Sequence, residues 1–565
     1  MSIKANLILA LLALAFSALT AQTETWQWAQ SAGGNSDDAA SCVAADEWGN
    51  SFTAGTFQDT LNIGTFSLIS EGDTDLYIAK ADPDGSWLWA IRAGGAASEM
   101  VNGIALDPDG NICVTGIFYG TATFGTTTLQ SEDWHDIFIA KLDPGGNWLW
   151  AKRAGGIYSD DAANLAIDAT GNIFLAGSFM DTVAFGDSVL TSYGGCDIFA
   201  AKMDPDGNWL WANQAGSIEE NTEYPFVPMG DFCLDLALDA GGNSYVTGAF
   251  VGTANFGDTS VSSAGEHDIF VGKLDPEGNW LWVSQAGGLS NNWGHRIIVD
   301  PADNIYIAGT YIENATFGDH ILNAVITAYP QLFVAGLNSN GIWQWANQAT
   351  AYDLISVGGL ALDDTNNLLL AGYFDGEASF GATIMISLGG SDVYLAKMDP
   401  DGNWLYTMQA GGLEDDQGTD VCVNGNDIFL TGSFSDMAMF GDYSLTSSGM
   451  ADAFVARIVQ YTPVLDETEA VPAAFTLNQN SPNPFKTGTT IPVQIGSGEG
   501  HYKLCVYDIR GRRVVTLVDG PLARGEHQIS WEGRDSQNRP LPSGVYFYRL
   551  QSDSGSSVKK MILHK

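Results

Sequence analysis

Pairs of neighbouring acidic residues recur along the chain, each just before a short β-prone segment. Carboxylates held close together repel one another, and a hard divalent cation that prefers oxygen ligands is a natural counter-ion for them. The pattern therefore suggests calcium as a cofactor, while the simpler interpretation is a set of hydrated acidic loops. The residues concerned are Asp37, Asp38, Asp160, Asp161, Asp415 and Asp416.

A second acidic pattern, Asp-Pro-x-Gly-Asn, also recurs, as in residues 107–111. It resembles half of a calcium loop but lacks the later carboxylate that completes an EF-hand-type site. The proline presets one backbone angle, and the glycine takes a conformation that other residues avoid. We therefore interpret these sequences as tight hairpin turns.

Two loops differ from the rest of the chain and are the best candidates for ligand contacts. One is the expanded segment 217–231, and the other is the segment LSNNWGHR at 289–296. Aromatic side chains beside carboxylates can stack on a sugar ring or bind a peptide. Ordinary variation of loop sequences would also produce such residues. The candidate ligand-binding residues are Tyr224, Phe226, Trp293, His295 and Arg296.

Signals for catalysis are weak. The chain has no Gly-x-Ser-x-Gly, His-Glu-x-x-His or P-loop pattern. A glycosidase or lyase could be built from Glu219, Glu220, Glu223 and His295, because two carboxylates suffice for glycoside cleavage. The separation that such carboxylates need cannot be read from sequence, so an enzyme remains the alternative to a binding module.

The elements that must position these residues are repeats marked by a Trp-x-Trp pair. The first tryptophans of successive pairs lie 61, 61, 61, 71, 63 and 61 residues apart. A period this steady indicates stacked supersecondary units. The pairs are Trp26/Trp28, Trp87/Trp89, Trp148/Trp150, Trp209/Trp211, Trp280/Trp282, Trp343/Trp345 and the altered copy Trp404/Tyr406.

Each unit contains four predicted strands, which in the second unit are 102–107, 111–118, 136–143 and 147–154. They are rich in β-branched and aromatic residues and bounded by Gly, Pro, Asp and Asn. Runs such as DIFIA are apolar at successive positions, so both faces of each sheet must be covered. Radially arranged four-stranded sheets satisfy this requirement in a β-propeller.

The repeat order predicts a closed ring. The repeat region opens on a fourth strand at 26–34 and stops after a third strand at 452–458. The N-terminal strand can therefore complete the last blade and leave no open edge. The sequence predicts an all-β chain with a seven-bladed propeller over residues 22–460. A Phe-Gly pair between the second and third strands of the units predicts an extra hairpin.

The block DIFIAKLDPGGNWLWAKRAGG at 136–156 and its copies resemble the SBBP-type β-propeller repeat family. The resemblance covers residues 26–460. It implies the propeller fold, but the family has no single known activity.

The composition changes after residue 460. Residues 461–473 form a predicted linker, and residues 474–565 contain short alternating strands typical of a small Ig-like β-sandwich. The motifs SPNPF at 481–485, WEG at 531–533 and SGVY at 543–546, with the terminal residues 559–565, resemble the C-terminal sorting domain of type IX secretion cargo. The resemblance is to the Ig-like subtype related to flagellar hook-capping proteins. It implies that residues 474–565 engage the type IX secretion machinery.

The N-terminus predicts export. Residues 1–21 combine Lys4, an apolar run of about fourteen residues and small residues near Ala21, which is typical of a signal peptide. No later stretch is as long and apolar as a membrane span. We therefore expect a secreted protein or one attached to the outer cell surface, without a transmembrane segment after signal cleavage.

The charge excludes some partners. The formal net charge is −44, and residues 472–565 hold 12 of the 23 Lys and Arg but only 7 of the 67 Asp and Glu. The repeat region is therefore strongly acidic and repels nucleic acid. The six cysteines show no paired spacing and are interpreted as small buried hydrophobes. The leading hypothesis is a binding or adhesion module for a glycan or protein, and the alternatives are a carbohydrate-active enzyme and a structural surface-layer protein.

Overall fold

The computed structural model describes residues 23–218, 230–326, 329–461, 475–496, 500–507, 512–552 and 555–564. Every regular element in these ranges is a β-strand. The chain divides into two compact units, residues 1–462 and residues 463–565, and each is described by itself. Within the described ranges, no helix of membrane-spanning length and apolarity occurs.

The second repeat shows how each unit folds. Strands β8 (Glu99–Leu106), β9 (Ile112–Phe118), β12 (Asp136–Leu142) and β13 (Trp148–Ala154) pair antiparallel in that order. Every residue of β9 and β12 is buried, as their unbroken apolar runs predict. The four predicted strands are thus confirmed, with the tryptophan pair at the start of the outer strand.

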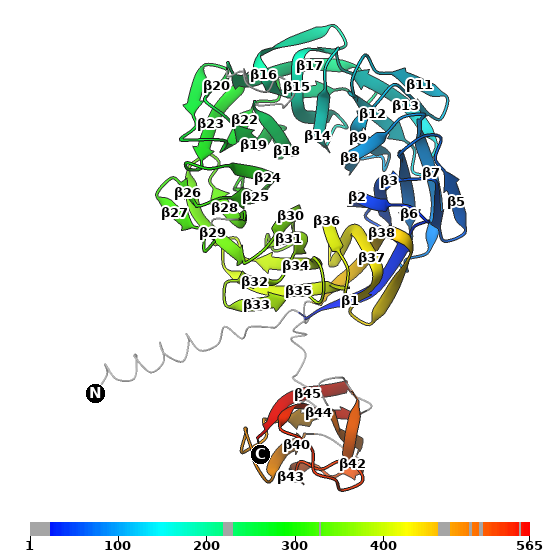
Figure 1. Cartoon of the computed structure of the whole chain (residues 1–565), viewed down its shortest axis with the longest axis vertical. Coiled ribbons are helices and arrows are strands. Elements are labelled where there is room, and N and C mark those ends of the chain that lie inside the picture. Colours follow the sequence, from blue (N-terminus) through cyan, green and yellow to red (C-terminus); the bar gives the residue numbers. More distant parts are fainter. Residues whose placement is uncertain are drawn as a thin grey trace. The chain divides into compact units, whose positions relative to one another are not determined.

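The same order of inner, second, third and outer strand recurs, and the described residues form seven such sets arranged in a ring with the inner strands toward its centre (Figure 1). The predicted propeller fold is confirmed. The first set is β2 (Asp38–Ala45), β3 (Ser51–Phe57), β6 (Asp75–Ala81) and β7 (Trp87–Gly95). The third is β14 (Asp160–Ile167), β15 (Ile173–Phe185), β16 (Ser188–Met203) and β17 (Trp209–Ser217). The fourth is β18 (Phe232–Leu238), β19 (Ser244–Phe250), β22 (Asp268–Leu274) and β23 (Trp280–Ala286).

The fifth set is β24 (Asn292–Val299), β25 (Ile305–Tyr311), β28 (Gln331–Leu337) and β29 (Trp343–Ala351). The sixth is β30 (Ile355–Leu362), β31 (Leu368–Phe374), β34 (Asp392–Met398) and β35 (Trp404–Gly412). The seventh is β36 (Asp416–Asn424), β37 (Asp427–Phe440), β38 (Tyr443–Tyr461) and β1 (Thr23–Ala32). We refer to these sets as the first to seventh blades.

The seventh blade confirms the predicted closure. Strand β1 pairs antiparallel with β38, so that Trp26 faces Ile458 and Ala32 faces Ala453. The two ends of the repeat region therefore share one sheet. The Trp28 indole N–H then donates to the carbonyl of Pro83 in the first blade at 2.9 Å. Contacts of this kind recur around the ring: Trp89 to Pro144, Trp211 to Pro276 and Trp345 to Pro400.

The predicted extra hairpins link neighbouring blades. In the second blade, β10 (Thr121–Phe124) and β11 (Thr127–Gln130) form a hairpin, and β10 pairs with the outer strand β7 of the first blade. The Phe124 ring packs edge-on against Trp148, with ring centroids 5.3 Å apart. The Phe-Gly pair therefore anchors the hairpin to its own blade while the hairpin extends the sheet of the preceding one. The separate hairpins elsewhere are β4 (Thr60–Ile63) with β5 (Phe66–Ile69), β20 (Thr253–Phe256) with β21 (Thr259–Ser262), β26 (Asn314–Phe317) with β27 (His320–Asn323), and β32 (Glu377–Phe380) with β33 (Thr383–Ile386).

The C-terminal unit is the predicted small sandwich. One sheet contains β39 (Phe475–Leu477), β40 (Thr489–Ile495) and β43 (Gly525–Trp531). The other contains β42 (Arg513–Leu522), β41 (Gly500–Tyr507), β44 (Gly544–Ser552) and β45 (Gly555–Leu563). Phe485, Trp531 and Tyr546 from the three sequence motifs meet in its core. All six cysteines of the chain are free, five buried and one half-buried, in agreement with their interpretation as small hydrophobes.

The closure can be tested with Trp28, whose exposure is 6%. We expect Trp28→Ala to destabilise the propeller by about 3 kcal/mol, because it removes a buried indole and the hydrogen bond to Pro83. Denaturant unfolding followed by circular dichroism measures the loss. Trp48→Ala, at a residue 68% exposed, is the control and should change stability little. Equal effects of the two substitutions would contradict a sealed ring.

Candidate functional site

The two ends of the propeller differ in what they carry. Inner strands and third strands both run toward the Asp-Pro-x-Gly turns at one end, such as residues 107–110 and 143–146. The loops that cross from one blade to the next, such as residues 155–159, lie at the opposite end with the loops that precede the third strands. We call this end the crossover face.

The predicted ligand-binding residues are not brought together in one loop. Tyr224 and Phe226 lie outside the described residues, as do Glu219, Glu220 and Glu223. Trp293 belongs to the inner strand β24, not to the preceding loop, and is half-buried. Its ring stacks on His267, with ring centroids 4.9 Å apart, and contacts Phe232 at 5.7 Å. The indole is therefore part of a packed aromatic stack between the fourth and fifth blades.

His295 also lies inside β24, at a β-bulge of the inner strand. Its Nε2 atom lies 3.0 Å from the hydroxyl of Thr310. Burial and the neighbouring Arg296 lower the pKa of this imidazole to about 4, so the side chain is neutral at physiological pH. His295 was expected in a loop and free to act as an acid or base, but it is a half-buried strand residue that is hydrogen-bonded to Thr310.

Arg296 follows the bulge and connects two blades. Its Nε atom donates to the carbonyl of Gly358 in the sixth blade at 2.6 Å. The guanidinium also lowers the pKa of two buried carboxyls, Asp235 and Asp420, against the larger effect of burial, which raises both. For Asp420 the net result is a pKa of about 6. Arg296 therefore compensates buried negative charge at the centre of the ring.

Asp235 and Asp420 each occupy the position after the same inner-strand bulge, in the fourth and seventh blades. Asp235 accepts hydrogen bonds from the side-chain amide of Asn164 at 2.7 Å and from the backbone N–H of Ile297 at 2.8 Å. Asp420 accepts one from the backbone N–H of Val43 at 2.9 Å. These side chains join inner strands of successive blades, and sequence analysis did not single them out.

Buried carboxyl pairs occupy the seams between blades. Glu99 begins the inner strand of the second blade and lies against Asp75, which begins the third strand of the first blade. The N–H of Gly95 donates to Glu99 at 2.9 Å. A Cβ on Gly94 would lie 2.4 Å from a Glu99 oxygen and 2.7 Å from the Asp75 carboxyl carbon, so glycine is required here. The Ala-Gly-Gly sequence of the repeat thus accommodates the carboxyls.

We call these contacts inter-blade acid pairs. They are Asp452 with Asp38, Asp75 with Glu99, Asp136 with Asp160, Asp197 with Asp231, and Asp392 with Asp416. Between the fourth and fifth blades, Asn292 faces Asp268, and its amide donates to that carboxyl at 3.4 Å. Between the fifth and sixth blades, Gln331 holds the third-strand position and bonds both backbone groups of Ala351 in its own blade. Amides therefore replace carboxyls at two of the seams.

The paired carboxyls are hard to ionise. Burial, and then the charge of the partner, raises the pKa of Asp38 and Asp416 to about 7. Burial and the charge of the partner also raise the pKa of Glu99 and Asp160 to about 8, although each carboxyl accepts a backbone hydrogen bond that lowers its pKa. Several of these side chains keep one buried oxygen without a hydrogen-bond partner, and a proton on one member of the pair supplies the missing donor.

The proposed calcium ligands fall into two groups. Asp38, Asp160 and Asp416 are buried in the acid pairs, whereas their neighbours Asp37, Asp161 and Asp415 are exposed. The six carboxylates proposed as calcium ligands are therefore split into a buried set and an exposed set. Across the described ranges, no three His, Cys, Asp or Glu side chains gather closely enough to hold a metal ion. Calcium binding stays a prediction.

Five exposed aromatic side chains from different blades lie on the crossover face, and sequence analysis missed them. Their exposures range from 45% to 57%. They are Trp134, Tyr158, Tyr193, Tyr329 and Tyr352. Exposed aliphatic side chains of the same loops accompany them: Ile157, Ile218, Leu289, Leu354, Leu388, Leu413 and Met450. A sequence signal was available for the crossover loops. An apolar residue follows the Gly-Gly pair and precedes the next acidic residue, as at Tyr158 and Leu413, and the type of this apolar residue differs between blades.

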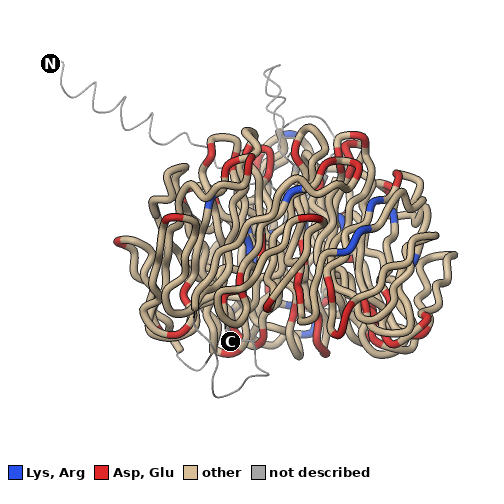
Figure 2. The backbone as a smooth tube through the Cα atoms, turned by 90° about the horizontal axis from the view of Figure 1, so that it is seen from above, with Lys and Arg blue, Asp and Glu red and all other residues tan. Residues whose placement is uncertain are grey.

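The loops that carry these side chains touch across the seams. A Cβ on Gly389 would lie 2.0 Å from the carbonyl of Leu413, and one on Gly265 would lie 2.2 Å from that of Leu289. Asp and Glu residues line both ends of the ring, with fewer Lys and Arg among them (Figure 2). The crossover face therefore combines aromatic, aliphatic and acidic groups on a backbone fixed by neighbouring blades.

Comparison with known families identifies one part of the chain. Residues 478–556 match the FlgD Ig-like domain. The match lies within the C-terminal unit and agrees with its sandwich fold and its resemblance to hook-capping proteins.

Two curated proteins are similar to parts of the chain. An uncharacterized WD repeat-containing protein, L264, of Acanthamoeba polyphaga mimivirus is 37% identical over 124 residues, covering 21% of this chain and 9% of that protein. The regulatory protein FlaEY of Caulobacter vibrioides is 26% identical over 246 residues, covering 42% and 25%. The chain thus spans a quarter or less of the length of these relatives.

Solved structures show only distant similarity. Puromycin hydrolase aligns at 10% identity with a TM-score of 0.39, over 81% of this chain and 59% of that one. YCF48 bound to D1 peptide aligns at 10% identity with a TM-score of 0.35, over 80% and 98%. PorZ, a surface component of the type IX secretion system of Porphyromonas gingivalis, aligns at 10% identity with a TM-score of 0.15, over 95% and 100%. Similarity at this level carries no functional inference.

The acid pairs make a prediction about pH. The pKa of Asp160 is raised from 3.8 to about 8, so the stability that its protonated form contributes is present below about pH 4 and is lost as pH rises to about 8. We expect Asp160→Asn to raise Tm relative to the natural chain at pH 8, by about 1 °C or more, and to lose this advantage near pH 4. Thermal unfolding across this pH range measures the difference.

A surface aspartate away from the acid pairs provides the control for that measurement. Asp187→Asn should give a Tm difference that does not follow this pH dependence, because Asp187 is exposed at the turn between β15 and β16. A lower Tm for Asp160→Asn at pH 8 would show that the carboxylate is stabilised when charged and would contradict the assignment.

Proposed function

We propose that this chain is a secreted or cell-surface-attached binding module whose crossover face binds an extracellular glycan or protein. The observation that supports it is the group of five aromatic side chains, half exposed, on loops held by neighbouring blades. Tyrosine and tryptophan offer large contact areas at small entropic cost and are typical of binding surfaces. Single exposed apolar side chains need no explanation, but five aromatic ones accompanied by aliphatic ones at one end of the ring make that end the best candidate for an interaction site.

The acidic groups restrict the ligand. The chain carries a formal net charge of −44, so nucleic acid and anionic lipid are repelled. Carboxylates beside aromatic rings can accept hydrogen bonds from sugar hydroxyls or from peptide N–H groups. A neutral glycan or a protein with a neutral or basic surface is therefore the expected partner.

The export route belongs to the same proposal. The FlgD Ig-like match over residues 478–556 supports the resemblance of residues 474–565 to a type IX sorting domain. The predicted signal peptide, residues 1–21, lies outside the described residues. On this proposal, the signal peptide directs passage of the inner membrane, and residues 474–565 engage the type IX machinery for release or surface attachment.

The binding proposal is tested on arrays of glycans and extracellular proteins, with the chain from Gln22 onward, in calcium and in chelator. We expect a ligand whose affinity falls about tenfold in the double variant Tyr158→Ala, Tyr352→Ala, because each removes a stacking surface. Trp48→Ala is the matched control, since Trp48 is an exposed aromatic residue at the turn between β2 and β3, at the opposite end. Binding lost equally in the control, or no ligand on either array, would contradict the proposal.

The array also separates the alternatives. Release of products from a polysaccharide, lost in Glu219→Gln or Glu220→Gln, would indicate a carbohydrate-active enzyme. Self-assembly without a ligand would indicate a structural surface-layer protein.

The export proposal has its own test. We expect a signal peptide–reporter protein fused to residues 474–565 to reach the medium or the outer surface of a bacterium with a type IX system, and to remain periplasmic in a strain without that system. Immunoblots of cell fractions measure the distribution. The reporter with the signal peptide alone is the control. Equal distribution of fused and unfused reporter would contradict the assignment.

A further inference from the structure

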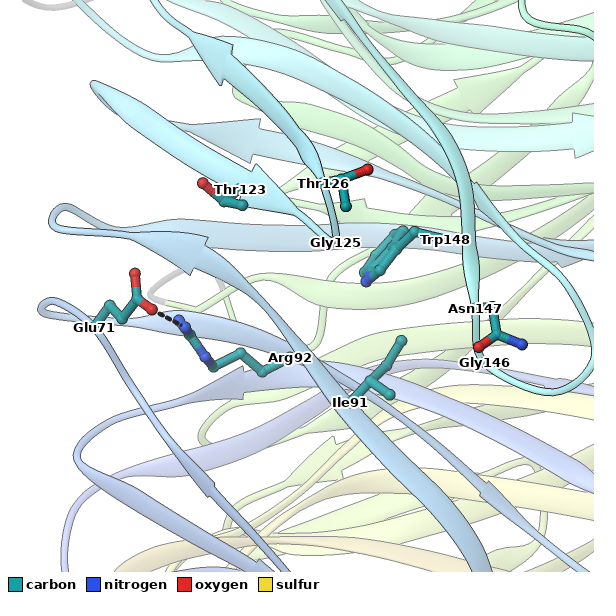
Figure 3. Close-up of a pocket in the computed structure, with 9 residues that line it drawn as sticks. All are labelled: Glu71, Ile91, Arg92, Thr123, Gly125, Thr126, Gly146, Asn147 and Trp148. Atoms are coloured by element: carbon teal, nitrogen blue, oxygen red, sulfur yellow. Dashed lines mark hydrogen bonds and ion pairs between the residues drawn. The ribbon is translucent and has the colours of Figure 1, made fainter.

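A groove of about 720 Å³ runs along the outer rim of the propeller between the first and second blades (Figure 3). The outer strand β7 contributes Ile91 and Arg92, and the hairpin of β10 and β11 contributes Thr123 and Thr126. Trp148, at the start of β13, lies across from Ile91. The volume falls within the range of about 300–1,000 Å³ that is typical of ligand pockets.

Ile91 lacks a hydrogen bond that the equivalent residue makes at three other seams. At three other seams, the residue equivalent to Ile91 is a hydrogen-bond donor. It donates to the carbonyl of the glycine in the turn between the third and outer strands of the next blade. Asn213 donates to the Gly278 carbonyl at 2.7 Å, and Asn347 donates to the Gly402 carbonyl at 2.8 Å. Ser284 donates in the same way to the Gly341 carbonyl. Ile91 has no donor for the carbonyl of Gly146, so this contact is missing.

The indole N–H of Trp148 is left without a partner in the same place. In the fourth and fifth blades, the equivalent N–H groups of Trp280 and Trp343 each donate to a carbonyl of the preceding blade at 3.1 Å. Among the described residues, no hydrogen bond involves the Trp148 N–H. In Figure 3 its nitrogen lies on the side of Ile91 and Arg92. The groove therefore presents an aromatic ring with an available donor.

The charge in the groove is already balanced. Arg92 pairs with Asp75 and with Glu71, so no unpaired cation faces the groove. The chain around it is strongly acidic. An anionic ligand would meet a repulsive field without a counter-charge, whereas a neutral ligand would not. The hydroxyls of the exposed Thr123 and Thr126 add groups that both donate and accept hydrogen bonds.

We propose that this groove binds a neutral saccharide. One face of a sugar ring is apolar and packs on the Trp148 ring and Ile91, while its hydroxyls bond the indole N–H and the threonine hydroxyls. This site goes beyond the proposed function of the crossover face, because it lies on the rim and rests on a different observation. Either site can be present without the other.

The test closes the groove without removing its aromatic ring. Ile91→Asn should restore the missing bond to the Gly146 carbonyl, as Asn213 makes it to Gly278, and should therefore fold with unchanged or raised stability. The probes are neutral malto-, cello-, laminari-, xylo- and manno-oligosaccharides, with oligogalacturonate as the anionic comparison. Isothermal titration with the chain from Gln22 onward should detect one neutral oligosaccharide. Its affinity should fall about tenfold in Ile91→Asn and in Trp148→Ala.

Two controls decide the interpretation. Asn213→Ile removes the equivalent bond at another seam and should leave the affinity of the first site unchanged. The variant Tyr158→Ala, Tyr352→Ala should also leave it unchanged, since those residues lie on the crossover face. Binding that Ile91→Asn does not weaken, preference for oligogalacturonate, or no binding of any neutral probe would each overturn the proposal. Loss only in the crossover-face variant would leave the proposed function standing and refute the groove.

Discussion

A four-stranded sheet that is apolar on both faces must be covered on both faces, and this constraint governs the whole propeller. Every residue of β9 and β12 is buried, so the second blade is stable only between the first and the third. The same requirement makes the pairing of β1 with β38 necessary, because an unfinished seventh blade would leave two apolar faces and a free edge. Signature residues of the repeat then serve the seams: indoles bond prolines of the next blade, and hairpins extend the preceding sheet.

The seams also carry a chemical feature that packing alone does not require. Placing two carboxyls in one buried seam is unfavourable when both are charged, and the fold accommodates them with backbone N–H donors and a shared proton. Amides take the place of one carboxyl at two seams without this need, Asn292 at the start of an inner strand and Gln331 at the start of a third strand. The ring therefore tolerates a neutral amide at either position. A protonated carboxyl is also neutral and can donate a hydrogen bond, so protonation of one member of each acid pair serves the same purpose. Stability of the propeller is thereby linked to pH through residues far from either proposed ligand site.

Periodicity allowed the strands, their order and the closure to be predicted, because each follows from spacing along one chain. The acid pairs could not be predicted this way, since Asp75 and Glu99 belong to different blades and meet only when the ring forms. Asp160 was therefore expected at the surface with Asp161, although successive residues of a strand point to opposite sides and only one of the two is buried. Trp293 and His295 were expected in a loop because no sequence signal showed that β24 begins at Asn292. The aromatic residues of the crossover face share a position only in three dimensions.

A repeat protein can acquire a ligand site by losing a structural contact at one seam, provided that other contacts hold the seam together. Between the first and second blades, the hairpin still pairs with β7, Trp89 still bonds Pro144, and Asp75 still faces Glu99. Replacement of a donor by Ile91 therefore removes one of several links, which is a small loss against the whole seam. It leaves the Gly146 carbonyl without that donor in a groove lined by the Trp148 ring and the apolar side chain of Ile91, surfaces on which the apolar face of a sugar ring could pack. The departure from the repeat, and not the repeat itself, is where a specific ligand would be recognised.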